Sequence, residues 1–265
     1  MKRVSFSKYQ GAGNDFVLID ACRDDPGLTH DEVRFLCDRR FGIGADGLMT
    51  LERDPAGTDF YMRYYNSDGG ESTMCGNGGR CIALFAEHLG IGERTKRFNS
   101  SDGFHEAELL ADGGIRLRMI DVAEVKPLAD GRSWFVFTGS PHYVEFVEDI
   151  MAADVEKRGA EIRRRPEYEA MGGTNVNFVQ VTGPGRIRVR TFERGVEAET
   201  LACGTGVTAS ALVTHYVRQP ECRDFTVEAM GGALGVMFAT NPEGGFAEVF
   251  LTGPAERVFT GEIEL

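Results

Sequence analysis

The sequence is poor in basic residues and has no long apolar run. Its 29 Lys and Arg stand against 41 Asp and Glu, which gives a formal net charge of -12 at pH 7. Nucleic-acid binding depends on a basic surface, so a nucleic-acid partner is not expected. No run approaches the roughly 18 apolar residues of a membrane span, and the N-terminal MKRVSFSKYQGAGNDF turns polar before a signal-peptide core could form. We therefore expect a cytoplasmic protein with no membrane partner.

Cysteine, histidine and lysine are also scarce. The six cysteines form no CxxC pair, and the five histidines do not join them at metal-ligand spacing, so neither a disulfide framework nor a structural zinc is expected. The five lysines lie in no evident phosphate cradle, which argues against pyridoxal-phosphate chemistry. GAGNDF lacks the third glycine and the setting of the dinucleotide fingerprint. No cofactor and no metal are expected.

Glycine is abundant, and its positions reveal an internal repeat. GESTMCGNGGRCIALF (70–85) matches AETLACGTGVTASALV (198–213), and this aligns Cys75 with Cys203 at an offset of 128 residues. Three glycine pairs keep the same offset elsewhere: Gly11 and Gly139, Gly44 and Gly172, and Gly103 and Gly231. Four segments in one register predict two similar domains that face each other, with a site in the cleft between them.

Each half is predicted to be rich in β-strands with one prominent helix. The two central helices, after Cys75 and Cys203, are apolar over much of their circumference, which suits a helix wrapped by its own sheet. A capping box at Thr29 and Glu32 predicts an earlier helix that stops at Gly42. We expect one half at 1–120, with 254–265 returning to it, and the other at 121–253. Strands are predicted at Phe16 to Ile19, Phe60 to Tyr65, Ile115 to Met119, Phe135 to Phe137, Phe178 to Val181, Ile187 to Phe192 and Ala247 to Leu251.

Cys75 and Cys203 lie where a thiol can become reactive. The N–H groups at a helix start and the positive end of the helix dipole favour thiolate, and the same donors suit a carboxylate. Two such thiols, one ionised and one protonated, could invert a carbon next to a carboxylate. Taken alone, either cysteine is typical of a buried structural residue, but the matched positions argue against that. The remaining four are expected to pack as small apolar side chains: Cys22, Cys37, Cys81 and Cys222.

Seven motifs occur in order along nearly the whole chain: GNDF (13–16), YNSDG (65–69), CGNGGRC (75–81), SPH (140–142), TNVNF (174–178), ERG (193–195) and ACGTG (202–206). Together they resemble the diaminopimelate epimerase family. The resemblance implies a cofactor-independent isomerase that interconverts LL- and meso-diaminopimelate, in lysine and peptidoglycan precursor biosynthesis. It also implies an α/β (α+β) fold of two pseudo-symmetric domains, each a mainly antiparallel sheet wrapped around a central helix. A homodimer stays open.

The resemblance assigns roles residue by residue. Cys75 and Cys203 correspond to the acid/base thiols, and His142 and Glu193 to the groups that poise them, without showing which serves which thiol. Arg194 can grip a distal carboxylate in a fork, and Glu193 can meet an ammonium. The substrate-binding positions implied are Asn14, Asn66, Gly76, Asn77, Asn175, Glu193, Arg194, Gly204 and Thr205.

Some of these residues also have ordinary structural interpretations. Asn14 and Asn66 lie in turn-prone contexts, and His142 after Pro141 could be a satisfied core histidine. The chain departs from the family pattern at Gly47, usually glutamine, and at Ser140, usually asparagine. The segment VEAETLA before the second cysteine is one residue longer than usual.

Three other functions are less consistent with the sequence. A proline or hydroxyproline racemase would need a ring pocket and typically carries histidine where this chain has Asn77. A catalytically silent member of the fold would be expected to lack one or both of Cys75 and Cys203, and both are present. The third is pyridoxal-phosphate racemisation, against which the five lysines and their contexts argue.

Overall fold

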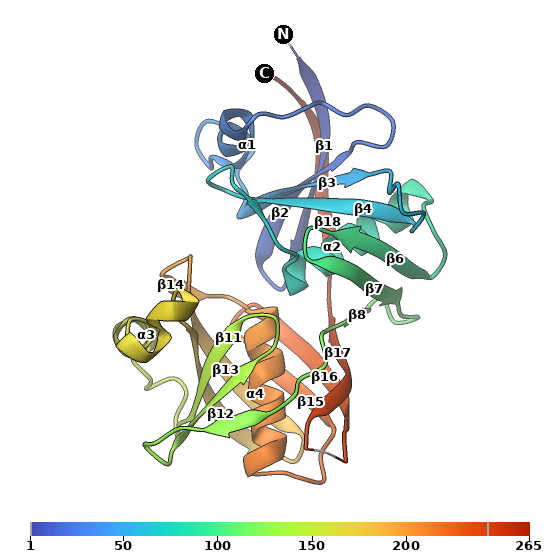
Figure 1. The fold of residues 1–265 in the computed structure, drawn as a ribbon. Helices are drawn as coiled ribbons and strands as arrows, with labels where there is room; N and C mark the ends of the chain where they lie inside the picture. The colour runs from blue at the N-terminus through green and yellow to red at the C-terminus, as the bar shows by residue number, and fades with distance from the viewer. Residues whose placement is uncertain (1, 243) are drawn as a thin grey trace. The chain divides into compact units, whose positions relative to one another are not determined.

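The computed structural model describes residues 2–242 and 244–265 (Figure 1). These residues form two compact units, one of residues 2–117 and 253–265, the other of residues 118–252 without residue 243. The chain leaves the first unit after Leu117 and returns to it at Gly253 for its last strand.

The sheet of the first unit mixes parallel and antiparallel pairs. β1 pairs antiparallel with β2 and β18, β2 runs parallel to β3, and β3 is antiparallel to β4. β4 then runs parallel to β6, which leads antiparallel into β7 and β8. The elements are β1 (Arg3–Gly11), β2 (Asn14–Asp20), α1 (His30–Cys37), β3 (Gly47–Glu52), β4 (Phe60–Asn66), β5 (Glu71–Ser72), α2 (Gly76–Leu89), β6 (Thr95–Ser100), β7 (Gly103–Leu109), β8 (Ile115–Arg118) and β18 (Glu256–Glu264).

The second unit repeats this order. β10 pairs antiparallel with β11, β11 runs parallel to β12, β12 is antiparallel to β13, and β13 runs parallel to β15, which leads antiparallel into β16 and β17. The elements are β9 (Val125–Pro127), β10 (Ser133–Phe137), β11 (Pro141–Phe146), α3 (Val155–Arg163), the 3-10 helix η1 (Pro166–Met171), β12 (Asn175–Gly183), β13 (Arg186–Glu193), β14 (Ala198–Thr200), α4 (Gly204–Val217), β15 (Asp224–Ala229), β16 (Gly232–Thr240) and β17 (Phe246–Gly253).

The helices α2 and α4 are central to their own units, as Figure 1 shows for α4 among β11, β12, β13, β15 and β16. Each has 14 residues and begins directly after a cysteine, which is its N-cap. α2 ends at Gly90, whose left-handed backbone (φ 70°) suits glycine. Nearly every residue of α4 is buried, so sheet packing holds it in place. Both predicted central helices are confirmed.

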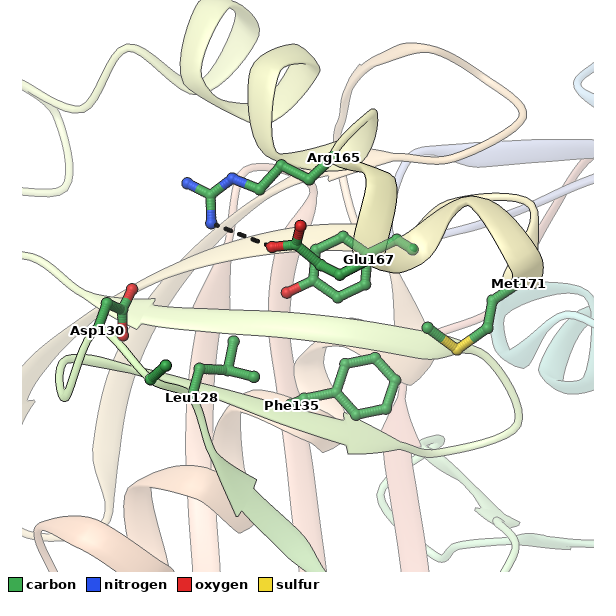
Figure 2. Close-up of a pocket in the computed structure, with 8 residues that line it drawn as sticks. Leu128, Asp130, Phe135, Arg165, Glu167 and Met171 are labelled. Carbon is green, nitrogen blue, oxygen red and sulfur yellow. Dashed lines mark ion pairs between the residues drawn. The ribbon is translucent and has the colours of Figure 1, made fainter.

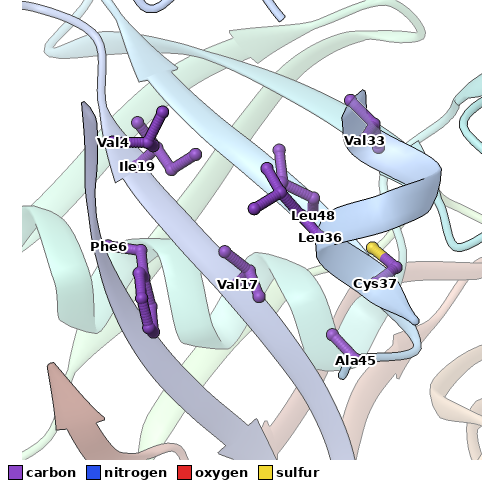
Figure 3. Packing of buried hydrophobic residues seen from close by; sticks show 9 residues of the cluster. All are labelled: Val4, Phe6, Val17, Ile19, Val33, Leu36, Cys37, Ala45 and Leu48. Carbon is purple, nitrogen blue, oxygen red and sulfur yellow. The ribbon is translucent and has the colours of Figure 1, made fainter. Parts of the chain in front are cut away.

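A second apolar layer covers the other face of the first sheet (Figure 3). There Val33, Leu36 and Cys37 of α1 pack against side chains of β1, β2 and β3. The predicted capping box is present, since Thr29 Oγ1 accepts from the Glu32 N–H and the Glu32 carboxylate accepts from the Thr29 N–H.

The prediction that this helix stops at Gly42 is wrong. α1 ends at Cys37, because the Asp38 carboxylate accepts hydrogen bonds from the backbone N–H groups of Arg40 (2.7 Å) and Phe41 (2.8 Å). These bonds draw the chain into a turn and end the helix early.

The predicted strands are confirmed, except that the strand predicted to reach Met119 ends one residue earlier, at Arg118 of β8. Cys37 and Cys81 are buried as predicted, whereas Cys22 and Cys222 lie in turns and are partly exposed, so the packing prediction is wrong for these two. Within residues 2–242 and 244–265, no helix combines the length and apolarity needed to cross a bilayer.

Candidate active site

Cys75 lies in a turn built by glycines at the start of α2. Its Sγ accepts a hydrogen bond from the Gly78 N–H at 3.4 Å, which satisfies one of the N–H groups left open at a helix start. The thiol also donates to Asn14 Oδ1 at 3.7 Å, and the Asn77 amide donates to the same oxygen at 3.4 Å. The sulfur is thus held between a donor that favours thiolate and an acceptor that favours thiol.

The orientation of Asn14 is fixed by a carboxylate behind it. Asn14 Nδ2 donates to Asp46 Oδ2 at 2.6 Å, so its carbonyl oxygen is the atom turned toward Cys75. Arg39 bridges Asp46 at 2.7 Å and Asp15 at 2.6 Å. Burial raises the pKa of Asp15, but hydrogen bonds from Arg39 and Lys8 outweigh it and hold that pKa below its usual range.

Cys203 occupies the matching turn at the start of α4. It is 6% exposed, and its Sγ lies 3.5 Å from Thr205 Oγ1. The turn is bound to the residue that follows β10, because Thr138 Oγ1 donates to the Thr205 carbonyl at 2.9 Å. A Cβ at Gly206 would lie 2.3 Å from Asn177 Oδ1 and 3.2 Å from Cys203 Sγ. A side chain at this position would collide with the Asn177 amide, so the turn requires glycine here.

His142 is fully buried in the same unit. Asn177 Nδ2 donates to the Tyr143 carbonyl at 2.9 Å, which fixes its amide, and also donates to His142 Nδ1 at 3.1 Å. Nδ1 is therefore an accepting nitrogen of the neutral ring, and the other ring nitrogen, Nε2, lies 3.5 Å from Asn175 Nδ2. Burial and the positive charge of Arg194 lower the pKa of His142 to about 3, although the bond from Asn177 opposes this.

We expect His142 to stay neutral throughout the physiological range. Its NMR imidazole signals should not move between about pH 5 and 8, because ionisation would place an unsolvated charge in the sheet. Since the folded pKa lies below the unfolded value, this group should stabilise the fold above about pH 6.5 and lose that contribution as the pH falls toward about 3. A His142 titration centred near 6.5 in the native protein would contradict this.

Glu193 and Arg194 follow each other at the end of β13. Glu193 accepts a hydrogen bond from Thr200 Oγ1. The Arg194 guanidinium donates to the Met171 carbonyl at 2.6 Å and to Ser140 Oγ at 3.4 Å, and the Arg194 N–H donates to Asn175 Oδ1 at 2.9 Å. Asn175 Nδ2 also donates to Ser140 Oγ, at 3.1 Å. Ser140 Oγ thus accepts hydrogen bonds from Arg194 and from Asn175, two of the predicted substrate-binding residues.

The predicted residues fall into separate groups within each unit. In the first unit, Asn14 and Asn77 contact Cys75 or its partners, while Asn66 is the exposed last residue of β4. In the second, one group surrounds Arg194, and the Gly204–Thr205 turn carries Cys203. Both residues predicted to poise the thiols belong to the unit of Cys203. Three side chains in these networks were not predicted from the sequence: Asp46, Arg80 and Asn177. Arg80 lies within the motif CGNGGRC and Asn177 within TNVNF.

Comparison with known proteins identifies one family over nearly the whole chain. The family model for diaminopimelate epimerase matches residues 6–124 and 134–258. The chain is 46% identical to a diaminopimelate epimerase of Flavobacterium psychrophilum over 254 residues, covering 95% of this chain and 97% of that protein. It is 42% identical to one of Chlorobaculum tepidum, with 96% and 99% covered. The chain belongs to the diaminopimelate epimerase family.

Solved structures of more distant proteins share its fold. A phenazine biosynthesis protein of the PhzF family from Bacillus anthracis superposes with a TM-score of 0.76 at 16% identity, covering all of both chains. A hydroxyproline epimerase from Agrobacterium vitis gives a TM-score of 0.69 at 16% identity, covering 100% of this chain and 93% of that one. At this identity the likeness concerns the fold alone. It confirms the predicted mixed α/β fold class.

Gly47 is explained by a bulky neighbour. Where the diaminopimelate epimerase family usually has glutamine, a Cβ on this residue would lie 2.5 Å from the ring of Tyr64 and 2.7 Å from the Tyr65 carbonyl. Tyr64 is buried and packs edge-on against Phe16, with ring centroids 6.1 Å apart. The tyrosine ring takes the room that a side chain at this position would need.

We expect Gly47→Ala to destabilise the first unit by roughly 1–3 kcal/mol, because a new Cβ must displace both a ring and a backbone carbonyl. Gly183→Ala in β12 is the matched control, since no atom lies within 4 Å of its added Cβ. Urea unfolding of both variants measures the difference. Equal stabilities would contradict the packing argument.

A cavity of about 550 Å³ opens in the second unit (Figure 2). Figure 2 shows Leu128, Phe135 and Met171 along it, with Arg165 paired to Glu167 at 3.9 Å. None of the predicted site residues lines it, and its lining offers no thiol for proton transfer. The cavity is linked to the predicted residues through Met171, which lines it and whose carbonyl accepts a hydrogen bond from Arg194. The cavity is therefore a poor candidate for the diaminopimelate epimerase reaction.

Proposed function

We propose that this chain inverts one α-carbon of diaminopimelate, interconverting the LL and meso isomers as an isomerase of lysine and peptidoglycan precursor biosynthesis. The observation that carries the proposal is the match to the diaminopimelate epimerase family over nearly the whole chain, together with a cysteine as N-cap of each central helix. The substrate follows from the family, and the roles of individual residues are proposed from their positions in the two units.

Cys75 and Cys203 are proposed as the two bases. One thiolate takes the α-proton, so an S–H bond forms and the C–H electron pair stays on the carbon and its carboxylate. The other thiol delivers its proton to the opposite face. One proton is removed and one is supplied, with no oxidation or reduction. Support comes from the backbone N–H groups at each helix start, which can stabilise the growing carboxylate charge.

The other proposed roles concern substrate binding and the support of the two thiols. Gly76, Asn77, Gly204 and Thr205 are proposed to bind the reacting carboxylate through the two helix starts. Arg194 is proposed to bind the distal carboxylate and Glu193 an ammonium group. The remaining proposed substrate contacts are amides: Asn14, Asn66 and Asn175. His142 and Glu193 are proposed to poise the two thiols for proton transfer, and His142 would do so as a neutral group, in keeping with its low pKa.

The two units are proposed to descend from a duplicated half, with domains at 1–120 plus 254–265 and at 121–253. The shared strand order and the equal lengths of α2 and α4 support this. A cytoplasmic location is proposed from the family. A homodimer stays a prediction; the exposed Val258 and Phe259 on β18 offer apolar surface for one, and sedimentation velocity checks it.

Solvent-deuterium exchange tests the function. Purified protein, LL-diaminopimelate and D₂O, with no added cofactor, should yield meso isomer carrying one deuterium at the inverted carbon. L-Proline and trans-4-hydroxy-L-proline in parallel reactions should take up none. Racemisation of either imino acid without turnover of diaminopimelate would overturn the proposal.

A further inference from the structure

The two central helices differ in charge at one matched position. Arg80 stands in α2 where α4 has Thr208, at the offset of 128 residues that relates Cys75 to Cys203. Both side chains bond the first carbonyl of their helix: Arg80 Nη1 donates to Gly76 O at 3.0 Å, and Thr208 Oγ1 donates to Gly204 O at 3.0 Å. The same backbone contact is thus made by a cation in one unit and by a neutral hydroxyl in the other.

Arg80 is fully buried and bonded to uncharged oxygens. Besides Gly76 O, its guanidinium donates to Asn77 Oδ1 at 2.8 Å and to the Pro254 carbonyl at 3.3 Å. Among residues 2–242 and 244–265, no carboxylate lies within ion-pair distance of it. A buried arginine ordinarily has an acidic partner, because an unsolvated charge is expensive. Burial accordingly lowers the pKa of this guanidinium.

The position of Arg80 near the start of α2 makes a nearby negative charge more favourable. A cation near the start of a helix adds to the positive end of its dipole. The ionisable groups that act on Arg80 are the thiols of Cys81 and Cys75. Burial raises the pKa of Cys81, whose side chain is fully enclosed, so that thiol stays protonated. Cys75 is partly exposed and already accepts an N–H bond, so it can hold the negative charge.

The other charged groups around the Cys75 turn have partners of their own. From the β2–β3 side, Asp46 reaches the turn through Asn14 and is paired with Arg39. From the β6–β7 side, Asp102 accepts from the Met74 N–H at 3.4 Å and is paired with His105 at 3.1 Å. Deeper in the sheet, Lys8 is paired with Asp15 at 2.8 Å.

We propose that Arg80 is a positioning residue that stabilises the thiolate of Cys75. Its charge favours the ionised sulfur, and its bonds to Gly76 and Asn77 hold the turn that carries the sulfur. The matched position in α4 carries the neutral Thr208, so the charge at this position distinguishes the surroundings of the two cysteines. The catalytic meaning of this difference rests on the proposed function; the ionisation itself does not.

The test is the pH dependence of Cys75 alkylation. Iodoacetamide is added to the purified full-length protein without substrate, and the modified peptides are quantified by mass spectrometry at each pH. In Arg80→Met, which keeps length but not charge, the midpoint of the Cys75 profile should rise by about one unit or more, as expected when an opposite charge nearby is removed. In Arg80→Lys it should stay near the wild-type midpoint.

Thr208→Val is the matched control, because it removes the corresponding bond in α4 without changing charge. Its Cys75 midpoint should equal that of the wild type. Circular dichroism verifies folding, and Arg80→Gln replaces the methionine variant if that protein does not fold. An unchanged midpoint in the folded neutral variant, or an equal rise in the lysine variant, would overturn the proposal.

Activity is measured separately. If wild-type protein epimerises diaminopimelate, the acid limb of kcat/KM should move to higher pH in Arg80→Met and return in Arg80→Lys. A wild-type protein that alkylates as expected but does not turn over diaminopimelate would refute the proposed function and leave the role of Arg80 standing. The two failures are therefore distinguishable.

Discussion

Alanine at Cys75 or at Cys203 is expected to reduce epimerisation by on the order of 10² to 10⁴, the usual contribution of a general acid or base. Each substitution removes the group that acts on one face of the α-carbon, and inversion needs both faces. Chiral chromatography measures the conversion of the LL isomer to the meso isomer and the reverse reaction. Either variant turning over at close to the wild-type rate would eliminate the two-base mechanism.

The double variant sharpens this experiment. Groups that act as a unit lose their effects together, so Cys75→Ala/Cys203→Ala should be hardly slower than either single variant. Cys222→Ala is the control, because this cysteine lies in a partly exposed turn of the second unit and should keep full activity. Strictly multiplicative losses would mean that the two thiols act independently of each other.

The central helices could be predicted because their signals are local and occur twice. Cys75 and Cys203 each follow a strand segment and precede a glycine-rich turn and an apolar run, and the repeat made chance agreement improbable. The end of α1 could not be placed in the same way. Asp38 ends that helix by binding two backbone N–H groups, and a side chain that competes with the helix in this way has no periodic signature.

Arg80 and Gly47 illustrate a different limit. An arginine inside a helix is ordinarily exposed, so nothing in CGNGGRC indicates that this one is fully buried among uncharged oxygens. The sequence shows that Gly47 departs from the family pattern, but the reason is the ring of Tyr64, which reaches it across the antiparallel pair of β3 and β4. Both facts depend on strand register and packing depth, which a single sequence does not specify.

Arg194 should decide which substrates are accepted. In the structure two of its five side-chain N–H groups are used by Met171 and Ser140, both uncharged acceptors, which leaves donors for a carboxylate. A lost charge-assisted hydrogen bond costs roughly 1.5 to 3 kcal/mol, so Arg194→Ala should lower kcat/KM for diaminopimelate by tens-fold or more. Arg194→Lys should also be impaired, because an ammonium cannot reproduce the bidentate fork.

The discriminating measurement compares two substrates. kcat/KM is determined for diaminopimelate and for an analogue without the distal carboxylate, in wild type, Arg194→Ala and the control Arg188→Ala. Arg188 lies on the same strand but is exposed and paired with Glu228, so its removal should change neither value. Arg194→Ala should weaken turnover of diaminopimelate and barely alter that of the analogue. Equal losses on both would assign Arg194 to holding the η1 segment through the Met171 carbonyl, and selection of a two-headed amino acid would then have to depend on other residues.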